Sequence, residues 1–144
     1  DFEFLAGIGG NLKDIVTFNF TGQYNNYKAR TQRDKTAWNL PNVRVSLYTD
    51  FKILPNLFTG IDLFYTGTRE DLDYQIGSTV PEKISLGGYL DLNFHIDYTF
   101  NKNWQVFLKA NNLTSEHYKK WLYYPSQGVQ AFAGVRYLFS LSNK

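Results

Sequence analysis

Asp91, His95 and Asp97 are the residues of this 144-residue chain whose types and spacing could do chemistry together. Side chains of a strand alternate between its faces, so the three would form a column on one face. Such a column could make a hydrogen-bonded cluster or bind a metal ion. The chain has only two histidines and no cysteine, which is poor material for a metal site. We therefore expect a polar network there, with no catalytic residue, metal or cofactor.

A second group of candidates is aromatic and lies mainly in residues 115–128. Flat rings stack on sugars or chelates, and the neighbouring Lys119 and Lys120 would attract anionic ligands. Alternatively, the rings belong to an interfacial girdle or fold against the wall of the protein. The candidate contact residues for a solute or partner are Trp38, His117, Tyr118, Trp121, Tyr123 and Tyr124.

The elements that must position these residues are strands. From Leu90 to Phe100, apolar residues occupy every second position, with polar residues between them. A helix would scatter the same residues around its circumference. The run is long for a soluble strand but suits one that crosses a bilayer, which takes roughly 9 to 11 residues. The same pattern predicts about seven strands, over residues 2–12, 16–24, 43–53, 57–65, 90–100, 104–113 and 129–139.

Two patterns indicate what kind of sheet this is. The apolar faces carry no formal charge, as lipid would enforce, although the inner face of a soluble sandwich would be equally clean. The connections alternate in length, which is typical of an outer-membrane barrel with short periplasmic turns and long extracellular loops. The short ones are residues 13–14, 55–56 and 101–103, and the long ones are 30–41, 69–83 and 115–128. We expect an all-β fold, an antiparallel transmembrane β-barrel segment.

Composition agrees with this expectation without proving it. The aromatic content is 18%, and no apolar run is long enough for a membrane helix. The net charge of +2 is too small to indicate nucleic acid as a partner. The first residue is Asp1, which we interpret as a processed, truncated or partly traced chain.

The C-terminal part of the sequence carries a family resemblance. Its alternating runs from Tyr89 onward resemble the last strands of TonB-dependent outer-membrane receptors. The element Asn111-Asn112-Leu113, followed by Tyr118, resembles the family's signature in the penultimate strand. Val135, Tyr137 and Phe139 are similar to the signal by which the barrel-assembly machinery recognises a last strand. Residues 140–144 extend past Phe139, whereas the aromatic residue is usually the final one in the family.

This resemblance implies a function and a set of partners. The family's barrels enclose an N-terminal plug and take up an iron chelate, vitamin or glycan across the bacterial outer membrane. The resemblance thus implies a receptor and not an enzyme. Its partners would be lipid, the assembly machinery, the TonB energising complex through a missing N-terminal part, and other outer-membrane subunits.

The domain expectation follows from the strand count. Seven antiparallel strands cannot close on themselves without a parallel seam, and an open edge in lipid would leave backbone groups unpaired. Residues 1–144 are therefore expected to be the C-terminal portion of a larger outer-membrane barrel, with no plug domain among them.

Two other functions remain open at this point. The first is a barrel without a plug that acts as a scaffold or partner subunit of an outer-membrane complex. The second is a soluble β-sandwich binding module. A plug upstream of Asp1 would separate transport from the scaffold, and extraction without detergent would identify the soluble module.

Overall fold

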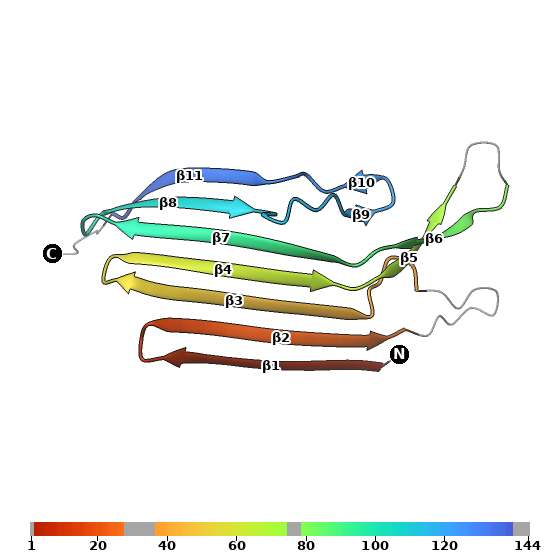
Figure 1. The fold of residues 1–144 in the computed structure, drawn as a ribbon, viewed down its shortest axis with the longest axis horizontal. Coiled ribbons are helices and arrows are strands. Elements are labelled where there is room, and N and C mark those ends of the chain that lie inside the picture. The colour runs from red at the N-terminus through yellow and green to blue at the C-terminus, as the bar shows by residue number, and fades with distance from the viewer. Residues whose placement is uncertain (1, 28–36, 75–78, 140–144) are drawn as a thin grey trace.

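The long strands form one antiparallel sheet (Figure 1) in the computed structural model, which describes residues 2–27, 37–74 and 79–139. The order in this sheet is β1-β2-β3-β4-β7-β8-β11, so each of these strands lies beside the one that comes next along the chain. These strands are β1 (Phe2–Leu12), β2 (Val16–Asn26), β3 (Val43–Leu54), β4 (Leu57–Thr66), β7 (Tyr89–Thr99), β8 (Trp104–Asn111) and β11 (Gln130–Tyr137). The expected seven-stranded, all-β sheet is confirmed.

The long connections differ from the expected plain loops. The connection expected over residues 69–83 contains strand β5 (Arg69–Asp73), which pairs with β6 (Glu82–Leu86) in a hairpin. The connection over residues 115–128 contains β9 (Lys119–Trp121), which pairs with β10 (Tyr124–Pro125). Backbone N–H and C=O groups outside the main sheet still need partners, and pairing within each connection supplies them. Figure 1 shows these pieces at one end of the sheet and the short turns at the other.

Several strand ends also differ from the predicted ones by one or two residues, and two of these differences affect candidate residues. β8 stops at Asn111 instead of Leu113, because Asn112 takes a positive φ of 52° that ends the extended backbone. β11 stops at Tyr137, so Phe139 lies beyond the last strand. Residues 30–36 of the loop expected over residues 30–41 lie outside the described residues. The tail of residues 140–144 also lies outside them. No helix in the described part of the chain is long and apolar enough to cross a membrane.

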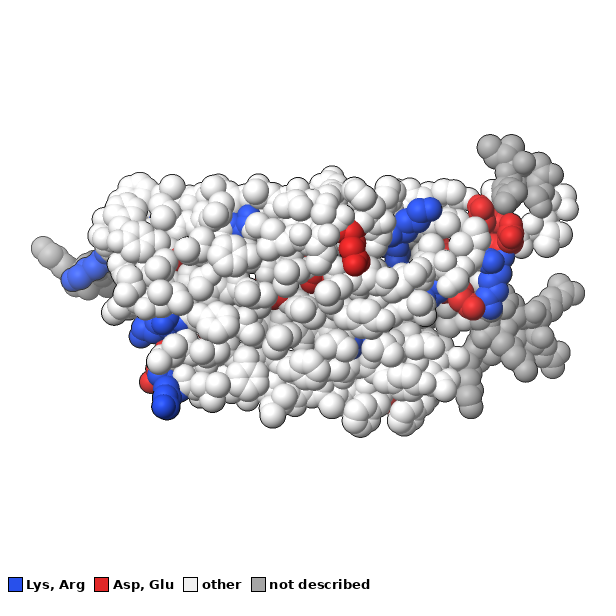
Figure 2. Space-filling model, viewed as in Figure 1, with Lys and Arg blue, Asp and Glu red and all other residues white. Residues whose placement is uncertain are grey.

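Strand register keeps the two faces of the sheet separate. One row across six strands consists of apolar or uncharged residues, namely Gly10, Phe18, Thr49, Ile61, Phe94 and Ala110. Among residues 2–27, 37–74 and 79–139 no second layer covers this face, so Ile8 is 64% and Val135 60% exposed. Figure 2 shows the face as nearly uncharged along the strands, with charged atoms gathered mainly toward the two ends. Its side chains are therefore free to pack against something other than the described part of this chain.

Two threonines on this face satisfy their own hydroxyl groups. Thr49 Oγ1 donates to the carbonyl of Ile61 at 2.6 Å, and Thr59 Oγ1 donates to the carbonyl of His95 at 2.8 Å. A hydroxyl facing water needs no such partner, whereas one facing hydrocarbon does. The apolar face is thus built so that its few polar groups do not depend on solvent.

The opposite face is polar, and on it a hydrogen bond between side chains of β3 and β7 crosses the intervening strand β4. His95 Nε2 lies 3.0 Å from Asp50 Oδ1, although β4 separates their two strands. The residue between them is Gly60, and a Cβ added there would clash with the His95 ring and with the carbonyl oxygen of Thr49. The glycine leaves the room through which the imidazole reaches Asp50.

Gly60→Val should destabilise the sheet by about 1 to 3 kcal/mol, because the new side chain must displace both the ring and a backbone carbonyl. The midpoint of thermal unfolding of the purified full-length protein in detergent would measure this loss. Gly22→Ala is the control, since a Cβ at Gly22 meets no atom within 4 Å. Equal midpoints for the two variants would mean that His95 and Asp50 do not need the space over Gly60.

Candidate functional site

The polar column of β7 does not act as one cluster. Asp91, His95 and Asp97 share a face, but each bonds to a different element. Asp91 Oδ2 accepts a hydrogen bond from the Tyr118 hydroxyl at 3.0 Å, and Asp97 Oδ1 accepts one from Gln105 Nε2 at 3.3 Å. His95 pairs with Asp50 as described above. Among the described residues, no group of three or more His, Cys, Asp or Glu side chains could hold a metal ion.

Tyr118 folds back onto the polar face at the long-loop end. Its ring stacks on Tyr89 with the centroids 3.7 Å apart and the planes 1° from parallel. Burial, and then the hydrogen bond to Asp91, raise the pKa of its hydroxyl, so it remains a neutral donor. Tyr118 therefore anchors its connection to the wall.

Asn112 fixes the start of the same connection. The residue is 5% exposed, and its Nδ2 donates to the carbonyls of Glu116 and Gln127 at 3.3 and 2.8 Å. Its backbone N–H donates to Asn93 Oδ1 at 3.0 Å. The left-handed backbone of Asn112, a conformation that asparagine tolerates well, turns the chain out of β8. The two ends of residues 112–127 are thus tied together by one side chain.

Arg69 joins three connections at the same end of the sheet. This residue is 5% exposed, and its Nε donates to Asn39 Oδ1 at 2.8 Å. Its two terminal nitrogens donate to the carbonyls of Gly87, Lys119 and Lys120, and the guanidinium lies 5.3 Å from the centre of the Tyr89 ring. These acceptors are neutral oxygens, so the electron-rich face of the ring provides the further contact that favours the buried charge.

Two hollows flank the anchored Tyr118. One, of about 710 Å³, lies between the β5–β6 hairpin and residues 116–123, and its lining includes Leu86, Leu122, His117 and Tyr123. The other, of about 450 Å³, lies over the outer end of the polar face, and its lining includes Asp91, Asn93, Lys120, Trp121 and Tyr124. Asp91 Oδ1 is buried beside this second hollow, with no hydrogen-bond partner in the described part of the chain.

The six predicted contact residues are thus not one cluster. His117, Tyr118 and Tyr123 line the first hollow, and Tyr118, Trp121 and Tyr124 line the second. Trp38 lines neither, and its backbone instead pairs with Glu70 in an isolated parallel bridge. Tyr123 and Tyr124 are 65% and 71% exposed, so their rings are available to a ligand.

Sequence reasoning missed the residues that arrange these hollows. Arg69, Asp71 and Asp73 were placed in a featureless loop, yet Asp71 Oδ2 accepts from the backbone of Leu122 at 3.3 Å and Asp73 accepts from the Tyr123 hydroxyl. The sequence from Arg69 to Asp73 has one apolar residue, Leu72, and therefore no alternation that signals a strand. Nothing in it showed that the strand faces residues 119–123.

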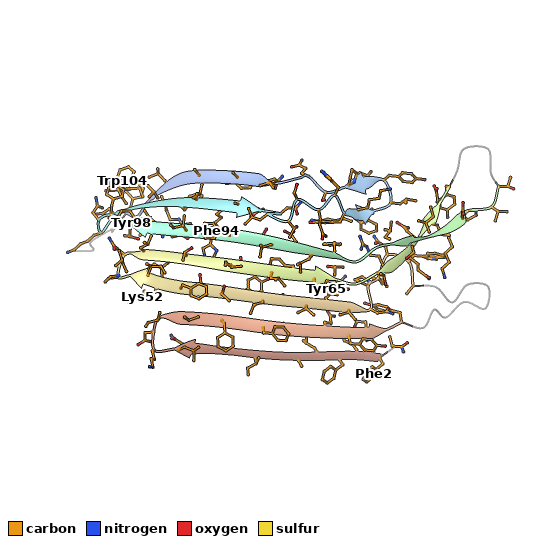
Figure 3. The ribbon with its side chains drawn as sticks, viewed as in Figure 1. Phe2, Lys52, Tyr65, Phe94, Tyr98 and Trp104 are labelled. Atoms are coloured by element: carbon orange, nitrogen blue, oxygen red, sulfur yellow. The ribbon has the colours of Figure 1, made fainter. Side chains whose placement is uncertain are left out.

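The aromatic residues at the short-turn end form a contiguous group. The ring of Tyr137 lies 4.7 Å from that of Trp104 and 4.5 Å from that of Phe139, measured between centroids. Figure 3 shows Tyr98 and Trp104 at this end, Phe2 and Tyr65 toward the other, and Phe94 between them. Phe139 itself is 83% exposed.

Known proteins share this architecture. FpvA of P. aeruginosa, in complex with heterologous pyoverdines, matches with a TM-score of 0.78 and 19% identity over 92% of this chain and 19% of that chain. The siderophore receptors PirA and PiuA from Acinetobacter baumannii match with TM-scores of 0.81 and 0.69 and identities of 15% and 21%. PirA is matched over 95% of this chain and 22% of that chain, and PiuA over 94% and 21%. The chain therefore spans about a fifth of the length of these receptors, and no curated protein matches it.

The family is decided by the sequence itself. The model of the family described as TonB dependent receptor-like, beta-barrel matches residues 2–113, which include β1 to β8. Proteins of this family lie in the bacterial outer membrane, so the uncharged face of the sheet is the one that meets lipid, and the polar face lines the barrel's interior. The long connections are then extracellular and the short turns periplasmic. The chain belongs to the TonB-dependent receptor-like β-barrel family.

Proposed function

We propose that the protein containing this chain takes up an iron chelate across the outer membrane, with energy from the TonB complex. The observation that carries the proposal is the pair of hollows beside Tyr118, which place exposed aromatic rings and lysines at the extracellular end of the interior wall. PirA and PiuA, to which the chain is similar, are siderophore receptors, and this supports the choice of solute class. The protein is then a transport receptor and not an enzyme.

The same proposal covers the domain arrangement. Residues 1–144 would be the C-terminal portion of the barrel, and a plug and the TonB-binding segment would lie upstream. Reading the sequence before Asp1 tests this directly. A barrel found there without a plug would favour a scaffold or partner subunit of an outer-membrane complex instead of a transporter.

Removing two of the rings should weaken uptake. In the full-length protein, we expect Trp121→Ala with Tyr124→Ala to raise the concentration for half-maximal uptake of a ferric siderophore about tenfold, since each lost aromatic contact costs about 0.5 to 1.5 kcal/mol. Uptake of radioactive iron by iron-starved cells that lack other receptors would measure it.

Tyr74→Ala is the matched control, because Tyr74 is 68% exposed and lines neither hollow. An effect as large for Tyr74→Ala would move the binding site away from the hollows. A protein that reaches the outer membrane yet transports none of a panel of hydroxamate, catecholate and mixed siderophores would overturn the iron-chelate proposal.

We also propose that Val135, Tyr137 and Phe139 form the signal read by the barrel-assembly machinery. Because Phe139 is 83% exposed, truncating its ring removes little buried area. Phe139→Ala should therefore lower the amount of protein in the outer membrane several-fold while leaving the thermal midpoint of the assembled fraction unchanged. Leu138→Ala, on the opposite face and 53% exposed, is the control. A lowered midpoint with a normal amount of protein would make Phe139 a stabilising residue only.

A further inference from the structure

The lipid-facing surface of β1, β2 and β3 is hollowed near its extracellular end. The hollow has a volume of about 410 Å³, and its lining includes Phe4, Ala6, Ile8, Phe20, Gly22 and Val45. We propose that it is a binding site for one acyl chain of an outer-leaflet lipid. The site goes beyond solute uptake and does not depend on which solute the receptor carries.

Strand register explains why the hollow is there. Ala6, Gly22 and Val45 are paired across the three strands and form a row of small side chains. The next row toward the extracellular end contains Phe4 and Tyr24, and the next row toward the periplasm contains Ile8 and Phe20. A Cβ built on Gly22 meets no atom within 4 Å, so the space above the backbone is open. Two rows of large side chains thus enclose a row that lacks them.

The chemistry of the hollow selects its occupant. The lining also includes Gln23 and Arg44, which belong to the opposite, polar face of β2 and β3. The side chains on the lipid-facing side are hydrocarbon or aromatic, and water would find too few polar partners to stay there. An apolar cavity of about 150 Å³ already holds a benzene molecule, so the larger hollow has room for a stretch of several methylene groups. On a membrane-facing surface, the abundant molecule of that shape and polarity is a lipid acyl chain.

The position of the hollow along the strands indicates that the acyl chain comes from the outer leaflet. Gly22 lies four residues before the end of β2 at Asn26, which is about 13 Å along the strand. Tyr24 lies between Gly22 and that end, as expected for an aromatic ring at the membrane interface. An acyl chain of a lipid whose headgroup lies at the extracellular interface beside Tyr24 would reach Gly22 with the half nearer its headgroup.

A second copy of the barrel fits the hollow less well. A symmetric contact between two copies brings the same surface of each against the other. Centred here, it would place hollow against hollow and leave a larger void, whose walls would lose their packing contacts. A flexible acyl chain fills the same space without that loss.

The test uses the full-length receptor in phosphatidylcholine vesicles that contain a phospholipid with a nitroxide on one acyl chain. Electron paramagnetic resonance counts the acyl chains whose motion the protein restricts. Gly22→Leu fills the hollow, and we expect it to lose one restricted chain per protein. Ala6→Leu fills the same row from β1 and should give the same loss.

Ala133→Leu is the matched control, because it adds similar bulk to the lipid-facing side of β11, outside the hollow. It should restrict as many chains as the unchanged protein. Each variant is first checked for folding by its heat-dependent mobility in detergent gels. If folded Gly22→Leu and Ala6→Leu restrict as many chains as the control, the hollow holds no lipid and the proposal is overturned. A dimer of the unchanged protein that both filling variants abolish would overturn it in favour of a second copy.

Discussion

Phe94→Arg should abolish assembly of the barrel in the membrane. Phe94 lies on the lipid-facing side of β7, paired with Ile61 of β4 and Ala110 of β8, near the middle of the strands. A guanidinium at that depth costs about 2 to 4 kcal/mol, and the neighbouring row offers no carboxylate to pair with it. The amount of heat-modifiable protein in outer-membrane fractions would measure the loss, which we expect to be nearly complete.

The control for Phe94→Arg makes the same substitution on the other face. Phe132 of β11 is 49% exposed and lies on the interior side, paired with Lys109 of β8. Phe132→Arg should therefore assemble. Asn93, next to Phe94, is a worse control because its side chain accepts the Asn112 backbone hydrogen bond. If Phe94→Arg and Phe132→Arg assembled equally well, the lipid-facing assignment of the apolar rows would be wrong.

The membrane-spanning part of the fold could be predicted from sequence because its physics is local. A strand in lipid must alternate, and each of the seven strands shows its own alternation from Phe2 to Tyr137. The pairing then follows from the connections, since consecutive antiparallel strands joined by short turns lie side by side. The register keeps apolar residues beside apolar residues, because a slip by one residue would turn a whole strand over.

The extracellular end could be predicted only in part, because its contacts join residues far apart in sequence. Arg69 bonds to the carbonyls of Lys119 and Lys120, fifty residues away, and no periodicity records such a pair. The same holds for Tyr118 and Asp91, where each residue was singled out for a different reason and the bond between them was not expected. The residue types in the sequence indicated that a site lies at this end of the sheet. The contacts between those residues could be identified only in the structure.

The alternating sequence pattern also did not predict which glycines of the interior face lie under an aromatic ring. Gly60 and Gly134 occupy interior positions as any small residue could, yet each lies under an aromatic ring of the neighbouring strand. A Cβ on Gly134 would lie 2.5 Å from the Phe107 ring, which also packs against Arg136 at 5.9 Å. Such ring-over-glycine contacts depend on which residues are paired across strands, and register is known only once the sheet is.

Arg69→Ala should release the extracellular connections while leaving the barrel wall intact. The substitution leaves Asn39 and the carbonyls of Gly87, Lys119 and Lys120 without their donor. Each hydrogen bond to a charged group contributes about 1.5 to 3 kcal/mol, so losing even one such contribution speeds local opening by roughly tenfold to a hundredfold. Hydrogen exchange of the full-length protein, followed peptide by peptide, should show this acceleration in residues 82–89 and 112–128 and none in β2 or β3.

Two further variants separate geometry from charge in this effect. Arg69→Lys keeps the charge but loses the planar fork that reaches several acceptors at once, so it should behave almost like Arg69→Ala. Lys83→Gln removes the nearby ion pair with Glu70, whose 2.6 Å contact joins side chains that are 51% and 42% exposed. An exposed pair of that kind is worth about 0 to 1 kcal/mol, so exchange there should change little. If Lys83→Gln opened the connections as much as Arg69→Ala, or if Arg69→Lys behaved like the unchanged protein, charge near the rim and not the buried guanidinium would hold them together.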